Sequence, residues 1–92
     1  MADDDSARRI QDMQTVVHGI RAQLNAGGVA YDPKQAAAEI VELIILMETL
    51  LVLKVVDFHA LNIARMLVTM NEPKVALDRL QSILLWHDVK LK

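Results

Sequence analysis

Residues 40–56, IVELIILMETLLVLKVV, decide how this chain folds. The stretch holds neither glycine nor proline, and at helical spacing its apolar side chains cover nearly every direction around the axis. A helix of this kind must be covered on all sides, by the rest of the chain or by a partner. It is shorter than the roughly 20 residues that cross a bilayer. Glu42, Glu48 and Lys54 would each cost about 2.5–3.5 kcal/mol near the bilayer centre, so we expect contact with protein and not with a membrane.

The helix that contains this stretch has a clear predicted start. Asp32 stands where an N-cap accepts a hydrogen bond from the first turn, and Pro33 suits the first helical position. Gln35 stands where a capping box has glutamate or glutamine. The pattern therefore predicts that a helix begins at residue 33.

The sequence leaves open where this helix ends. No further proline or glycine occurs until Pro73, and one helix over residues 33–70 would far exceed the usual length of about 11–12 residues. Val55 and Val56 are both β-branched, and Asp57 follows them in an N-cap role, which slightly favours a break there. One helix and two helices both remain compatible with the sequence.

The N-terminal region predicts an amphipathic helix that packs along one side. Ser6 is placed to cap it, and Gly27 and Gly28 follow its predicted end. Apolar residues recur at alternating steps of three and four, which is the pattern of a heptad seam. The seam consists of Ile10, Met13, Val17, Ile20 and Leu24. The residues between them, including Gln14 and Arg21, form a predicted solvated face.

A last helix follows the turn at Asn71 and Pro73. Asn71 is placed to cap it, and proline is tolerated in a first turn. Its predicted inward face consists of Ala76, Leu77, Leu80, Ile83 and Leu84. We expect this helix to fray over residues 87–92.

Length and composition indicate a single all-α domain over residues 1–92. A chain of this size buries only about 60–65% of its unfolded surface, yet 53% of the residues are hydrophobic and only 3% are aromatic. We therefore predict a small bundle of three or four helices that self-association completes, as a homodimer. Methionine often fills irregular gaps in a core. We expect that role for Met13, Met47, Met66 and Met70.

Charge, cysteine content and histidine spacing argue against several functions. The net charge is −2, and the basic stripe of a nucleic-acid binder is missing. The lack of cysteine excludes a disulfide framework and a cysteine-based zinc site, and it fits a cytoplasmic location. His18, His59 and His87 have neither the four-residue spacing nor the Glu-x-x-His pattern of a metal-binding helix. We expect no metal, no cofactor and no catalytic residue.

Glu48 is the unusual polar residue within the apolar stretch, because its helical neighbours one turn away are aliphatic. It is either a paired contact that determines which helices associate or a rim residue whose stem reaches water. Glutamate is rarely buried unless it is paired, so the second case is the commoner one. Ten residues form the predicted interface. They are Ile10, Met13, Val17, Ile20, Leu24, Ile44, Glu48, Leu51, Val52 and Val55.

Residues 60–88 resemble a single degenerate tetratricopeptide unit. Small and large residues stand at the family's positions on either side of a turn. The matching residues are Ala64, Leu67, Asn71, Ala76 and Leu80. The chain departs from the pattern at Ile83, where the repeat usually has alanine, and at Asp88, where it usually has proline. No second copy occurs upstream at the repeat's period. The resemblance implies protein binding, as in small helical adaptors and chaperones.

We therefore expect a non-enzymatic protein–protein interaction module, such as a small adaptor, chaperone or inhibitor-type regulator, that binds itself and another protein. One alternative is a helix-turn-helix DNA-binding regulator over residues 66–86. The residues that its reading helix would expose are too acidic and too sparse for that role. They are Lys74, Asp78, Arg79, Gln81 and Ser82. A further alternative is a metal-dependent helical-bundle enzyme.

Overall fold

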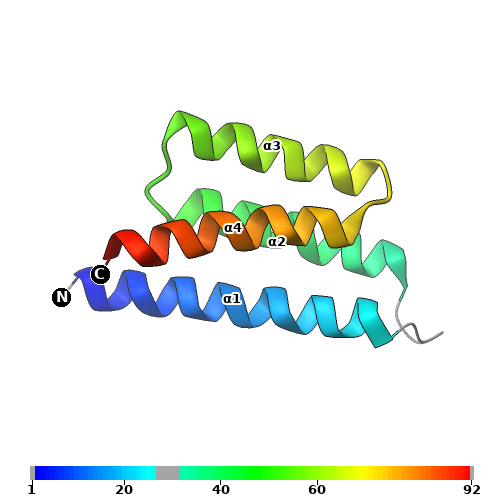
Figure 1. Cartoon of the computed structure of the whole chain (residues 1–92), viewed down its shortest axis with the longest axis horizontal. Helices are drawn as coiled ribbons and strands as arrows, with labels where there is room; N and C mark the ends of the chain where they lie inside the picture. Colours follow the sequence, from blue (N-terminus) through cyan, green and yellow to red (C-terminus); the bar gives the residue numbers. More distant parts are fainter. Residues whose placement is uncertain (1, 27–31, 92) are drawn as a thin grey trace.

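The computed structural model describes residues 2–26 and 32–91, which form four α-helices. Helices α1 (Ala2–Ala26), α2 (Pro33–Leu50), α3 (Val55–Thr69) and α4 (Pro73–Leu91) follow one another in alternating directions (Figure 1). Helix α4 contacts the other three, whereas α1 and α3 do not touch within the described residues. The predicted all-α bundle is confirmed, with four helices, and its elongated body measures 43 × 23 × 18 Å.

The core of the bundle is aliphatic and lies between the four helices. The seam of α1 is buried except for Leu24, which is half-buried against the same core. The predicted inward face of α4 is also buried in full. The largest fully buried side chains are Ile10, Val17, Ile40, Leu43, Ile44, Met47, Leu61, Leu77, Leu80 and Leu84. Both amphipathic patterns read from the sequence therefore face the core.

The long apolar stretch divides into two helices joined by an extended segment. Helix α2 ends at Leu50, and Leu51 and Lys54 both have extended backbone angles. The favoured break is thus confirmed, but the predicted N-cap is wrong, because Lys54 is the N-cap residue of α3. Asp57 lies in the first turn, where its Oδ2 accepts a hydrogen bond from the Lys54 N–H at 2.9 Å. A carboxylate three positions after the cap can also accept one of the free N–H groups at a helix start.

The start of α2 is as predicted, with Asp32 as N-cap and its Oδ1 accepting from the Lys34 N–H at 2.9 Å. The predicted cap of α1 is wrong, because Ser6 lies inside a helix that begins at Ala2. Gly27 and Gly28, which predicted the end of this helix, lie outside the described residues.

Asn71 ends α3 and does not cap α4, contrary to the sequence prediction. Its φ of 64° is left-handed, a conformation that asparagine tolerates better than most residues. The Asn71 N–H donates to the Val68 carbonyl at 3.0 Å, and the Glu72 N–H donates to the Leu67 carbonyl at 2.8 Å. These two bonds form a Schellman motif. Helix α4 continues to Leu91, so the expected fraying from residue 87 is also wrong.

One chain covers only one side of α2. Ile40, Leu43, Ile44 and Met47 point into the core, whereas the opposite side of α2 is exposed. The large apolar side chains exposed on α2 are Val41, Ile45, Leu46 and Leu50. Met13 and Met47 fill the core as expected, but that expectation is wrong for Met66 and Met70, which are exposed. None of the described helices has the length and hydropathy needed to cross a membrane.

Candidate protein-binding surfaces

Most of the ten predicted interface residues are buried or half-buried within one chain. Ile10, Met13, Val17, Ile20 and Ile44 are buried, and Leu24 and Leu51 are half-buried against the core. Only Val52, 92% exposed, and Val55, 73% exposed, are freely accessible apolar members of the set. Both lie at the connection between α2 and α3. Most of the apolar residues predicted for the interface are therefore not accessible at the surface of the fold.

An open groove runs along the contact between α1 and α2 and is named here the α1/α2 groove. Buried side chains form its floor, and half-exposed aliphatic side chains form its rims. The floor includes Met13, Ile20 and Leu43, and the rims include Val16, Leu46 and Leu50. Arg9 and Asp12 lie at one end, and Gln23, Glu39 and Glu42 line the other. The groove is thus apolar along its middle and charged at both ends.

The rim residues of the α1/α2 groove were missed by the sequence reasoning. Val16 lies next to the seam residue Val17 and falls outside the heptad pattern. Leu46 and Leu50 belong to a helix that is apolar all round, so periodicity alone does not show which of its sides the chain covers. Helix α2 packs against α1, α3 and α4 together. That arrangement, and not the local pattern, leaves Leu46 uncovered.

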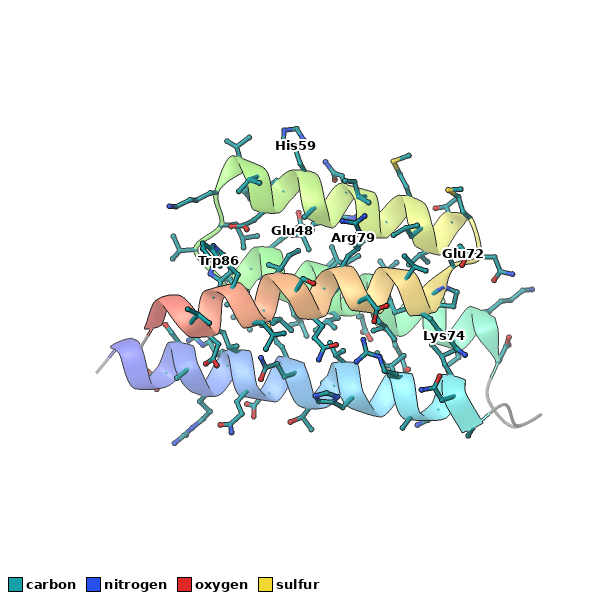
Figure 2. The ribbon with its side chains drawn as sticks, in the orientation of Figure 1. Glu48, His59, Glu72, Lys74, Arg79 and Trp86 are labelled. Carbon is teal, nitrogen blue, oxygen red and sulfur yellow. The ribbon has the colours of Figure 1, made fainter. Side chains whose placement is uncertain are left out.

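A second groove lies between α3 and α4 and is named here the α3/α4 groove. It is lined by Val56, Asp57 and Ala60 from α3 and by Ser82, Ile83 and Trp86 from α4. Trp86 is 57% exposed, and Figure 2 shows it on the side of α4 that faces the start of α3. Among the described residues, the buried core contains no aromatic side chain, so this ring lies outside the core. The composition contained a signal for this second surface, because tryptophan occurs once among apolar residues that are mostly aliphatic.

Asp57 and His87 form a largely buried polar pair at the end of the α3/α4 groove. Asp57 Oδ2 lies 3.2 Å from His87 Nε2, and their side chains are only 9% and 13% exposed. Since Asp57 Oδ2 also accepts the Lys54 N–H, the pair links the start of α3 to the C-terminal part of α4. Within the described part of the chain, no three histidine, aspartate or glutamate side chains come together as a metal site would require. His59 points outward from α3 (Figure 2).

Glu48 pairs within the chain, with Arg65 of α3. The guanidinium donates to Glu48 Oε1, and its other terminal nitrogen donates to Asn62 Oδ1 at 3.3 Å. The side chains of Glu48 and Arg65 are 29% and 38% exposed. The pair therefore connects α2 to α3 at the surface of the bundle. Glu48 is paired, as in the first interpretation of the sequence, but its side chain stays partly exposed, as in the second.

Removing this ion pair is expected to have a small effect. Glu48→Gln should lower the free energy of unfolding by about 0–1 kcal/mol, because solvent screens partly exposed pairs and both side chains lose freedom in forming them. Thermal denaturation followed by circular dichroism measures the change. Arg65→Gln serves as the matched variant and should give a similar loss. A loss several times larger in either variant would show that the pair is effectively buried.

Arg21 joins α1 to α4 and does not lie on a solvated face as predicted. Its two terminal nitrogens donate to Gln81 Oε1 and to Asp78 Oδ1, each at 2.6 Å. Gln14, almost two turns before Arg21 and so on the same side of α1, is also partly buried. The side of α1 that faces α4 is therefore polar but covered. The opposite side of α1 forms the α1/α2 groove.

Helices α3 and α4 form an antiparallel hairpin and lie side by side (Figure 1). The helices of a DNA-binding helix-turn-helix instead meet at about 90–120°. Ala64 and Ala76, the small residues of the tetratricopeptide resemblance, are both fully buried in this hairpin. No family model, curated protein or solved structure matches this chain. The tetratricopeptide resemblance therefore stays a prediction.

Proposed function

We propose that this chain is a non-enzymatic protein-binding module that forms a homodimer through the α1/α2 groove. The observation that carries the proposal is the row of half-exposed aliphatic side chains Val16, Leu46 and Leu50 along one open groove. A small adaptor, chaperone or inhibitor-type regulator in the cytoplasm would use such a module to present its other surfaces to another protein. The proposal assigns no catalytic residue, metal or cofactor.

The size of this face is compatible with a modest dimer. Helix α2 has 18 residues and is about 27 Å long at 1.5 Å per residue. Two helices packed about 10 Å apart are about 20 Å wide, so the face measures roughly 540 Å². That value is close to the roughly 600 Å² per partner at the lower limit of specific interfaces. We therefore expect a dimer that dilution can dissociate.

The antiparallel arrangement of α1 and α2 suits a two-fold dimer. Arg9 lies seven residues before Val16 on α1, and Glu39 lies seven residues before Leu46 on the antiparallel α2. A two-fold axis that lies in the plane of the interface and crosses both helices at Val16 and Leu46 would therefore place the Arg9 end of one groove over the Glu39 and Glu42 end of the other. An interface of this symmetry uses the same patch on both copies. In that register Arg9 is attracted to the acidic end of the other groove, whereas Asp12, which lines the same end as Arg9, opposes part of this attraction.

Solution mass tests the proposal. The wild-type chain is expected to be a dimer at micromolar concentration by light scattering. Leu46→Glu should give a folded monomer, because it places a charge in the middle of the apolar contact. Leu85→Glu is the matched control, since Leu85 is 49% exposed on α4 and Leu46 is 45% exposed on α2. This control should stay dimeric.

Two results would contradict the proposal in different ways. A wild-type monomer with no dilution dependence would exclude self-association in that concentration range. If Leu85→Glu dissociated the dimer and Leu46→Glu did not, the copies would associate through α4. Circular dichroism of each variant separates loss of association from loss of folding.

A further inference from the structure

We propose that the α3/α4 groove binds an amphipathic helix of a partner protein in which acidic residues flank the apolar stripe. This inference rests on the proposed protein-binding function but uses a different surface from the one assigned to self-association. Within the helices that the structure describes, α1 does not touch α3. The two grooves are therefore formed by different helix pairs, and a dimer through the α1/α2 groove leaves the α3/α4 groove open.

The apolar part of the groove has the shape and composition of a helix-binding site. Val56 and Ala60 of α3 face Ile83 and Trp86 of α4 across an open channel between two antiparallel helices. A third helix can lay its apolar stripe along a channel of this kind. Trp86 is the only tryptophan of the chain and is more than half exposed. Tryptophan and arginine are the residue types most enriched among the residues that dominate binding energy at protein interfaces.

The exposed charge beside the groove is positive. Arg79 lies seven residues before Trp86, almost two full turns, and so lies on the same side of α4. Figure 2 shows both side chains on the side of α4 that faces α3, with Lys74 on the other side. Lys54 adds a second exposed cation at the start of α3.

The acidic groups of these helices do not balance the two cations. Asp57 is the only acidic residue of α3 and is buried against His87 and the Lys54 N–H. Asp78, which precedes Arg79, is bound to Arg21 on the α1 side of α4. Asp88, the other acidic residue of α4, is half-buried and already has a contact within the structure. Glu72 lies in the α3–α4 turn, at the far end of the hairpin from Trp86 (Figure 2). Carboxylates on the partner are therefore the complementary charge.

Two synthetic peptides test the inference. Both are 16-residue helix-forming sequences with leucine at positions i, i+3, i+4 and i+7. One carries glutamate on both flanks of the stripe, and the other carries lysine. The glutamate peptide is expected to shift the Trp86 fluorescence of the full chain to shorter wavelength in a saturable titration, because the peptide covers the ring. The lysine peptide should cause no shift.

Charge reversal locates the binding site. Arg79→Glu should weaken binding of the glutamate peptide at least tenfold and should make the lysine peptide bind. Lys74→Glu is the matched control, since it makes the same charge change on the same helix but outside the groove. It should leave both titrations unchanged. Circular dichroism verifies that each variant is folded.

Several outcomes would overturn the inference. Equal weakening by Arg79→Glu and Lys74→Glu would show non-specific attraction. Loss of binding in Leu46→Glu and not in Arg79→Glu would place the peptide in the α1/α2 groove. No shift with either peptide, or a shift only with vesicles that contain anionic phosphatidylglycerol, would exclude an acidic helix as the ligand. Light scattering on the same samples tests the dimer separately, so failure here leaves the proposed self-association standing.

Discussion

Replacing Val17 with aspartate is expected to unfold the chain at 25 °C. Val17 is fully buried at the centre of the α1 seam, where its neighbours in the core are aliphatic. An unpaired carboxylate placed there costs several kcal/mol, because it loses its hydration and gains no partner. The whole stability of a domain of this size is only about 5–14 kcal/mol. A single substitution can therefore remove most of it.

His18→Asp is the control for this experiment, because it introduces the same side chain at the next position, on the exposed side of α1. We expect it to change the free energy of unfolding by no more than about 0.5 kcal/mol. Far-ultraviolet circular dichroism and urea denaturation measure both variants. If Val17→Asp and His18→Asp behaved alike, the seam would not face the core of the protein in solution.

Replacing Asp57 with alanine is the second change with a large expected effect. We expect the free energy of unfolding to fall by about 2–3 kcal/mol, because two polar groups lose their partner at once. The Lys54 N–H loses its acceptor at the start of α3, and His87 Nε2 loses its neighbour while its side chain stays 13% exposed. For a domain of this size the midpoint of thermal unfolding should drop by roughly 8–20 °C.

A double-mutant cycle with His87→Ala separates the two roles of Asp57. The part of the lost free energy of unfolding that arises at the start of α3 should be the same whether or not His87 is present. The part that arises from the Asp57–His87 contact should vanish in the His87→Ala variant. The two substitutions together should therefore cost less than the sum of their separate costs. Additive costs would mean that the contact contributes nothing and that Asp57 acts only at the start of α3.

The candidate surfaces were only partly visible in the sequence. The excess of aliphatic residues correctly indicated that apolar surface would remain uncovered, because a short chain cannot enclose a helix that is apolar all round. Which residues stay uncovered depends on where the neighbouring helices lie. Val16 and Leu46 line a groove that no periodicity marks, whereas the predicted interface residues Val17 and Ile44 are buried within the chain.

The sequence by itself determined the features that depend on local spacing. The α1 seam, the inward face of α4 and the N-cap at Asp32 were all predicted correctly, since each depends on residues within a few turns of one another. Only the tertiary structure decided the features that join distant segments. Asp57 meets His87, thirty residues later, and Arg21 meets Asp78 because the bundle places α1 and α4 side by side. The free energy of such contacts depends on burial and on neighbouring helices, and neither can be read from one helix alone.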